Sequence, residues 1–299
     1  MLSAIIINHR SSMLADAAAR SLLGGSLAPD EIVVIDNEGT DGGLSAELRA
    51  RPDVRLVARA ENPGYSASCN LGAKSARGDI LLFLNADVAL EPDCLRRCAA
   101  ILADDPGIGI VTARLVRPDG TLDHACHRGL PTTASSLAYL LRLHRLAPRS
   151  RRLGGYTMSW LDPLTEHDVE ACSGAFMLMP RAVLDAAGGW DERYRFYGED
   201  LDLCLRVRDA GWRVRYVADA VATHVKGAFS LRDVPDEALT PEQRRHKLAV
   251  RRDVLAAHRL FYAEHLEAGA AWPMRRAAEL LFRVQERRLS QAERRASRA

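Results

Sequence analysis

The chain has 299 residues, of which 47% are hydrophobic and 27% are charged, a composition ordinary for one large α/β domain with an appendage. The formal net charge of +2 gives the whole protein no general attraction to nucleic acid, although arginines are concentrated near the C-terminus. No apolar run approaches the roughly 20 residues that span a bilayer, and we recognise no signal peptide, so we expect a cytoplasmic protein that could contact the membrane from the inside.

The first third of the chain alternates strands with helices. Short apolar runs rich in β-branched residues predict strands at 4–7, 31–35, 54–57 and 80–84. Apolar spacing and glycine stops predict helices from 11 or 12 to 24, at 44–50, and from 65 to about 78. Because such alternation produces parallel strands with right-handed crossovers, we predict a doubly wound α/β sheet.

The strand at 80–84 is the centre of this pattern. Its five consecutive apolar residues predict a strand that is buried on both faces, and it is followed at once by the polar residues Asn85 and Asp87. Ligands of open α/β sheets bind beyond the carboxyl ends of the strands. Asp87 is therefore predicted to face a ligand, and the alternative is that Asn85 and Asp87 only cap a turn.

The ends of the predicted strands and the helix that follows the third strand carry short polar side chains, at Asn8, Asp36, Asn70 and Asp87. These side chains suit hydrogen bonds to a base and a ribose, and the binding of a metal ion. No glycine fingerprint follows the first strand, and the chain has no GxxxxGK[ST] loop. A hydride-transfer enzyme with a dinucleotide cofactor and a P-loop enzyme are therefore not expected.

The region from 92 to 168 is predicted to be only partly regular. We expect a helix at 92–102 and a strand at 108–113, then a less ordered segment at 117–168 with a short apolar helix at 137–143. A basic stretch follows at 142–152. We interpret 117–168 as an insertion that covers one edge of the site and recognises an acceptor. A structural loop with a solvated basic face is the alternative.

Regular structure is predicted again from 170. The pattern predicts strands at 170–180 and 212–217 and helices at 181–187 and 199–210. Glu199 and Asp200 open the second helix, where the helix dipole favours acids for purely structural reasons. Aromatic and glycine residues precede these acids, including Trp190 and Tyr197, and this arrangement also describes an acceptor pocket.

The last 64 residues, 236–299, are predicted to form a helical, arginine-rich extension of a domain that covers 1–235. Apolar positions recur at helical spacing beside many arginines, which is typical of a helix on an anionic membrane surface. Packing on the catalytic domain with a solvated basic face, and dimerisation, are the alternatives.

The cysteines and most histidines are expected to be structural. No CxxC pair is present, so a zinc site is not expected, and the cysteines are interpreted as small buried hydrophobic residues in a reduced compartment. His9, His124 and His127 are likewise interpreted as structural residues.

Several motifs together give the chain a family resemblance. In their order and spacing they resemble family 2 glycosyltransferases of the GT-A fold, above all bacterial rhamnosyltransferases of cell-wall or O-antigen linker synthesis, over roughly residues 2–230. The motifs are Val34-Ile35-Asp36-Asn37, Asn62-Pro63-Gly64-Tyr65, Asn70-Leu71-Gly72, Leu84-Asn85-Ala86-Asp87, Ser173-Gly174-Ala175, Gly189-Trp190-Asp191-Glu192, Tyr197-Gly198-Glu199-Asp200-Leu201-Asp202-Leu203, Gly211-Trp212 and His224.

The resemblance implies roles for individual residues. Asp36 would contact the nucleotide base with Asn70 nearby, Asp87 would hold a divalent metal that His224 completes, and Asp200 would be the general base. Asn85 stands where the family has the first aspartate of its DxD motif. Its amide lacks the charge for metal binding but can still hydrogen-bond a ribose hydroxyl.

The same helix offers two further acids besides Asp200. Asp202 is four residues before Arg206, so we expect these two side chains to pair. Glu199 could orient the site or bind a sugar hydroxyl.

The chemistry of sugar transfer agrees with these roles. A nucleoside diphosphate leaving group gains charge, which a divalent cation stabilises, and a carboxylate with an imidazole suits Mn²⁺ better than Mg²⁺. One base and a direct displacement give inversion at the anomeric carbon. The resemblance favours dTDP-rhamnose as donor and a polyprenyl-diphosphate-linked sugar as acceptor. A UDP- or GDP-sugar donor, a nucleotidyltransferase and a non-catalytic binding module are the alternatives.

Overall fold

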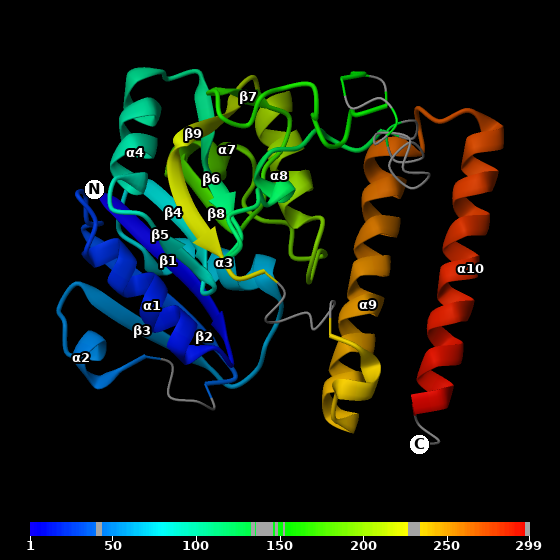
Figure 1. Cartoon of the computed structure of the whole chain (residues 1–299), viewed down its shortest axis with the longest axis horizontal. Helices are drawn as coiled ribbons and strands as arrows, with labels where there is room; N and C mark the ends of the chain where they lie inside the picture. The colour runs from blue at the N-terminus through cyan, green and yellow to red at the C-terminus, as the bar shows by residue number, and fades with distance from the viewer. Residues whose placement is uncertain are drawn as a thin grey trace.

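The computed structural model describes residues 1–39, 44–132, 135, 146, 149–151, 153–226 and 234–296. An α/β domain built on one sheet is followed by two long antiparallel helices that lie beside it (Figure 1). The helix predicted at 137–143 and most of the basic stretch at 142–152 lie outside the described residues.

The sheet has nine strands in the described part of the chain, eight of them in the order β3-β2-β1-β4-β8-β6-β9-β5, with β7 paired to β9. The strands are β1 (Leu2–His9), β2 (Glu31–Asn37), β3 (Val54–Arg59), β4 (Ile80–Asn85), β5 (Val88–Leu90), β6 (Ile108–Val116), β7 (His167–Val169), β8 (Phe176–Pro180) and β9 (Arg213–His224). The predicted parallel half is confirmed, since β3, β2, β1 and β4 are parallel to one another.

The other half of the sheet is mixed. Strand β8 is antiparallel to both β4 and β6, whereas β6 and β9 are parallel. The prediction of one strand at 170–180 is wrong, because only residues 176–180 belong to β8. The backbone at Gly174 leaves the strand ladder and bonds side chains instead: its carbonyl accepts from the Tyr65 hydroxyl, and its amide donates to Asp200.

The helices fall close to their predicted positions. They are α1 (Ser12–Leu23), α2 (Ala46–Arg49), α3 (Tyr65–Ser75), α4 (Cys94–Asp104), α7 (Arg181–Ala186), α8 (Glu199–Asp209), α9 (Pro241–Phe261) and α10 (Trp272–Ala296). Strand β4 forms the core as predicted, since residues 81–84 have no exposed surface. Helix α3 lies so close to β1 that a side chain at Gly72 would overlap Ile5.

The C-terminal helices join the α/β domain through α9 and a π-helical turn, Tyr262–Leu266. Helix α9 lies between that domain and α10 (Figure 1). Phe261 is buried, and His265 bonds Asp202 of α8 at 3.0 Å. Glu264 pairs with Arg193 in the loop before α8. The C-terminal helices therefore contact α8, the helix that carries the predicted base Asp200, and the loop before it.

Candidate active site

Two polar side chains predicted at the strand ends are neighbours in the sheet. Asn8 and Asp36 occupy paired positions on β1 and β2, and the Asn8 amide donates a 2.8 Å hydrogen bond to Asp36 Oδ1. Both residues are buried, and the Oδ1 atom of Asn8 has no hydrogen-bond partner among the described residues. This end of the strands therefore holds a buried carboxylate beside an amide oxygen, Asn8 Oδ1, that can accept a hydrogen bond.

Asp87 and His224 are brought together by strand pairing. Asp87 lies in the turn between β4 and β5, and β5 pairs antiparallel with the end of β9, so that Val88 is opposite His224. The Asp87 Oδ1 and His224 Nε2 atoms are 3.3 Å apart, and both side chains are largely buried. A carboxylate and an imidazole at the end of a buried strand are the ligand types that could hold a divalent cation.

Asp123 completes this cluster, and sequence reasoning did not find it. Its Oδ2 atom lies 2.8 Å from His224 Nδ1, and its Oδ1 atom accepts a 2.6 Å hydrogen bond from Lys226 Nζ. Burial opposes ionisation of this side chain, but His224 and Lys226 outweigh that effect and hold the pKa of Asp123 well below its usual range. Asp123 is thus an ionised carboxylate that is hydrogen-bonded to the imidazole of His224.

The environment of His224 fixes which ring nitrogen faces the site. Burial disfavours the imidazolium, but hydrogen bonds to Asp123 and Asp87 outweigh burial and raise the pKa of His224 to about 9. Because Nδ1 is engaged by Asp123, Nε2 is the atom presented to Asp87. A carboxylate behind a histidine in this way orients the ring and increases its basicity as a metal ligand.

The backbone before α8 is strained where it presents the two acids. Tyr197 and Gly198 have φ angles of 68° and 85°, and Gly198 immediately precedes Glu199 at the helix start. A non-glycine residue in this left-handed region costs free energy, and such strain is often found at functional sites. Tyr197 is 41% exposed.

Three groups contact the carboxylate of Asp200. Its Oδ2 atom is 2.5 Å from Arg128 Nη2 and accepts a 3.3 Å hydrogen bond from the Gly174 amide. Its Oδ1 atom accepts from the Leu201 amide at 2.8 Å. Asp200 is thus a fixed carboxylate with a small exposed fraction, 13% of its side chain.

Glu199 has a different environment from its neighbour. It is buried, and its Oε2 atom has no hydrogen-bond partner among the described residues. Burial, assisted by the negative charge of Asp200, raises the pKa of Glu199 to about 8. Glu199 is therefore largely neutral near pH 7, whereas the carboxyl group of Asp200 beside it is paired with a cation, Arg128.

Asp202 has a structural environment, and its predicted pairing with Arg206 is confirmed. The Arg206 guanidinium donates two hydrogen bonds to Asp202 Oδ2, at 2.6 and 2.9 Å, and His265 bonds the other oxygen. Asp202, Glu264 and His265 lie near enough to share an ion. However, Arg206 and Arg193 already neutralise the two carboxylates, so this group has no free charge for a cation.

Asn70 and Trp190, predicted as binding residues, contact each other. The Asn70 amide bonds both the backbone nitrogen and the carbonyl of Trp190, at 3.0 and 2.8 Å. Trp190 is only 2% exposed and packs edge-to-face on Phe83 and Tyr65. Its indole therefore presents almost no surface to an acceptor, and Asn70 holds the turn that leads to Tyr197.

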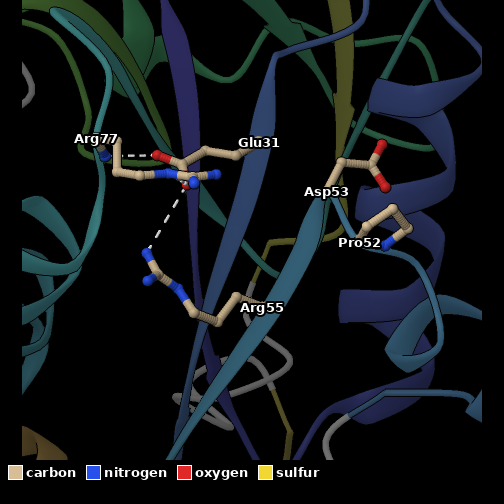
Figure 2. Close-up of a pocket in the computed structure, with 5 residues that line it drawn as sticks. All are labelled: Glu31, Pro52, Asp53, Arg55 and Arg77. Atoms are coloured by element: carbon tan, nitrogen blue, oxygen red, sulfur yellow. Dashed lines mark hydrogen bonds and ion pairs between the residues drawn. The ribbon is translucent and has the colours of Figure 1, made fainter.

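A surface pocket lies at the amino ends of the strands, where β2 and β3 begin, and so at the other end of the strands from Asp36 and Asp87 (Figure 2). Glu31 at its base forms ion pairs with Arg77 at 3.1 Å and with Arg55 at 3.8 Å. The amino ends of parallel strands are not where α/β proteins bind ligands. This pocket is therefore not part of the candidate active site.

The chain matches a known protein family over most of its length. The model of the family described as "Glycosyltransferase like family 2" matches residues 2–244. The chain belongs to this family. It is a glycosyltransferase, as the motifs predicted, and the match covers the α/β domain with all the site residues described above.

Relatives of this glycosyltransferase include named rhamnosyltransferases. The "N-acetylglucosaminyl-diphospho-decaprenol L-rhamnosyltransferase" of Mycobacterium tuberculosis is 29% identical over 216 residues, 69% of each chain. The "O-antigen biosynthesis protein RfbC" of Myxococcus xanthus is 31% identical over 73% of this chain but only 17% of its own length.

Solved structures support the GT-A fold. A mannosyltransferase from Pyrobaculum calidifontis in complex with GDP-Man and Mn²⁺ is similar over 98% of this chain and 84% of its own, with a TM-score of 0.52 and 19% identity. GalNAc-T7, crystallised with UDP, GalNAc and Mn²⁺, has a TM-score of 0.55 and 16% identity over 75% of this chain and 43% of its own. The glycosyltransferase therefore has the predicted mixed α/β fold of the GT-A type.

The raised pKa of Glu199 predicts a pH dependence of stability. The ordinary pKa of a glutamate is 4.5 and the pKa of Glu199 in the fold is about 8, so the native state binds more protons between these pH values than the unfolded state. Stability from this site is therefore lost as pH rises from 4.5 to 8. Glu199→Gln, which cannot ionise, should gain stability relative to the wild type across that range, measured by denaturant unfolding at several pH values.

Glu237→Gln, at an exposed glutamate, is the matched control for this measurement. A difference between Glu199→Gln and the wild type that stays constant from pH 4.5 to 8 would show that Glu199 is ionised in the native state throughout.

Proposed function

We propose that this protein transfers L-rhamnose from dTDP-rhamnose, with inversion, to a hydroxyl of a polyprenyl-diphosphate-linked sugar during cell-wall or surface-polysaccharide synthesis. The observation that carries the proposal is the contact of Asp87 with His224 at the carboxyl end of β4, in a family 2 glycosyltransferase. The name of the Mycobacterium tuberculosis relative supports rhamnose as the sugar and a lipid-linked acceptor.

The donor base is proposed to bind at Asp36. A carboxylate can accept the imide N–H of thymine or uracil, and the amide of Asn8 fixes the orientation of this carboxylate. Asn85, the last residue of β4, is proposed to bond a ribose hydroxyl. Asn70 is proposed to act through the Trp190 backbone that it holds.

A thermal-shift screen tests the donor. A ligand that binds only the native state raises its stability by mass action. We expect dTDP-rhamnose with Mn²⁺ to raise the melting temperature more than a UDP- or GDP-sugar does, and Asp36→Asn to reduce that increase. A larger shift with UDP- or GDP-sugars would reassign the donor, and no shift with any sugar nucleotide would contradict the proposed function.

A divalent cation, Mn²⁺ or Mg²⁺, is proposed to bind at Asp87 and His224. The donor set fits it, because Asp87 offers a carboxylate oxygen and His224 would offer Nε2, on release of the Nε2 proton, while Asp123 holds its other nitrogen. When bound, the cation would neutralise charge that develops on the leaving diphosphate. Asp123 and Lys226 keep the imidazole oriented toward that position.

Removing the carboxylate behind His224 tests this assignment. Asp123→Asn should weaken Mn²⁺ binding about 10–100-fold, because the support for the histidine ring is lost. Isothermal titration calorimetry measures the affinity directly. Asp202→Asn is the matched control, since Asp202 is also a buried carboxylate bonded to a histidine, and it should leave Mn²⁺ binding unchanged. Equal affinities for wild type and Asp123→Asn would remove Asp123 from the site.

Asp200 is proposed to be the general base. In the transfer, the acceptor oxygen bonds the anomeric carbon, the bond to the diphosphate breaks, and the hydroxyl proton passes to the Asp200 carboxylate. Glu199, which is neutral up to about pH 8, is proposed to bond a sugar hydroxyl, and exposed Tyr197 to contact the acceptor. Trp190 is proposed to support this surface from the core.

Asp200→Asn keeps the size of the side chain but removes the proton acceptor. Turnover should fall about 10²–10⁴-fold, while the affinity for dTDP-rhamnose stays within a few-fold of the wild type. Steady-state kinetics and donor titration measure the two quantities. If Asp200→Asn is fully active and Glu199→Gln is inactive, Glu199 is the base.

We propose that α10 contacts the inner face of an anionic membrane, where a lipid-linked acceptor would reside. None of the helices in the described ranges is long and apolar enough to cross a bilayer. Phe282 packs on Tyr262 of the π-helical turn, whereas Leu280 and Val284 are exposed on the other side of α10, and Arg287 and Arg288 are exposed beside them. Such an apolar stripe between arginines complements anionic headgroups.

Vesicle sedimentation tests the membrane contact. The protein should bind phosphatidylglycerol vesicles more than phosphatidylcholine vesicles, and Leu280→Ser with Val284→Ser should weaken this binding. Met13→Ser, at an exposed apolar residue of α1, is the control. Unchanged vesicle binding by the double variant would contradict the contact. A dimer that the double variant abolishes would instead assign the stripe to a second copy.

A further inference from the structure

We propose that Arg128 is a positioning residue for the general base: it keeps the Asp200 carboxylate ionised and fixes its orientation. It also links the proposed acceptor-side segment that contains Arg128 to α8. This inference rests on the proposed function of Asp200. The Arg128 Nη2 atom is 2.5 Å from Asp200 Oδ2, and their side chains are only 12% and 13% exposed. An ion pair that is largely shielded from water is screened much less than a surface pair.

Arg128 is held firmly by its own surroundings. Its backbone forms an isolated bridge with Ala171, with hydrogen bonds in both directions. Its guanidinium also donates to the Cys172 carbonyl at 3.3 Å and to the Tyr156 hydroxyl at 3.4 Å. The Nη2 atom therefore bonds both Asp200 and the Cys172 carbonyl, while Nη1 bonds the Tyr156 hydroxyl and fixes the plane of the guanidinium.

Three observations separate this pair from an ordinary structural ion pair. Asp200 retains 13% of its side-chain exposure, so a substrate hydroxyl can reach it. Its neighbour Glu199 is buried, and its Oε2 atom has no hydrogen-bond partner among the described residues, so the ion pair of Arg128 is formed with Asp200 and not with Glu199. The Gly174 amide and the Arg128 guanidinium bond the same oxygen, Oδ2, whereas Oδ1 accepts from the Leu201 amide alone among the described residues.

The proton balance explains how the pair would work. Before transfer, Asp200 is an anion beside the Arg128 cation. When the acceptor hydroxyl attacks, its proton passes to Asp200, and the neutral acid no longer has a charge for Arg128 to stabilise. After product release the proton leaves to solvent and the ion pair reforms. Arg128 therefore stabilises the form of Asp200 that is competent to begin each cycle.

Other groups around Asp200 do not provide this charge. Burial raises the pKa values of Tyr65 in α3 and of Cys172 before β8, so both stay neutral. Cys204 in α8 is buried beside Cys172, and Glu199 is the acid next in sequence. Among the described residues whose charge acts on this cluster, Arg128 is the cation. Burial opposes its charge, but Asp200 outweighs burial and raises the pKa of Arg128.

The test is the pH profile of kcat/KM for Arg128→Met, Arg128→Lys and the wild type. Removal of a positive charge at this distance should move the acid limb of the Arg128→Met profile up by about 1–3 pH units. Arg128→Lys keeps the positive charge but loses the planar guanidinium that orients Asp200. The acid limb of its profile should therefore stay near that of the wild type, while kcat falls at least about tenfold. Added guanidinium should partly restore Arg128→Met.

Arg206→Met is the matched control, because Arg206 pairs with the buried Asp202 on the same helix and does not contact Asp200. It should lower stability without moving the acid limb. An unchanged acid limb in folded Arg128→Met overturns the proposal, and if that variant does not fold, wild-type kcat in Arg128→Lys does so. Failure of the proposed function is separate: in that case the wild type would not transfer sugar at all.

Discussion

The site depends on the pairing of a short strand with the end of a long one. Strand β5 has three residues, and its antiparallel pairing with β9 brings Asp87, on a turn after the buried β4, next to His224. Neither β4 nor β9 carries both groups, so this ladder is what creates the contact between a carboxylate and an imidazole. The Asp123 carboxylate then fixes the ring, because Nδ1 of His224 faces it at 2.8 Å. Loss of the β5–β9 pairing would separate these groups without changing any of them.

The catalytic helix depends on packing from both sides of the loop before it. On one side α3 holds this loop: the Asn70 side chain bonds Trp190, and Ser66 donates to the Tyr194 carbonyl at 2.8 Å. On the other side, Ala257 of α9 lies against Gly198, and His265 bonds Asp202. This packing surrounds the loop whose left-handed residues, Tyr197 and Gly198, lead into Glu199 and Asp200 at the start of α8. The C-terminal helices are therefore a structural support of the site as well as the proposed contact with the membrane.

Much of the fold could be predicted from sequence, because local patterns determine it. The apolar run at 80–84 and the alternation of strands and helices predicted the parallel half of the sheet, and Asp202–Arg206 followed from helical spacing. Asp123 and Arg128 could not be predicted in this way. Their partners, His224 and Asp200, lie far away in sequence, and both residues belong to an irregular segment without a period that would indicate which side is buried. The antiparallel direction of β8 was not predicted either, because it depends on pairing with β4 and β6, which lie far away in sequence.

The most direct test of the account is sugar transfer by purified, metal-stripped protein from dTDP-rhamnose to a polyprenyl-diphosphate-linked acceptor. We expect no transfer in chelator and recovery on addition of Mn²⁺ or Mg²⁺. Asp87→Ala and His224→Ala should stay folded but should not recover activity with either metal. Full activity of the metal-stripped protein in chelator would contradict the central claim that Asp87 and His224 form a metal site for the departing diphosphate.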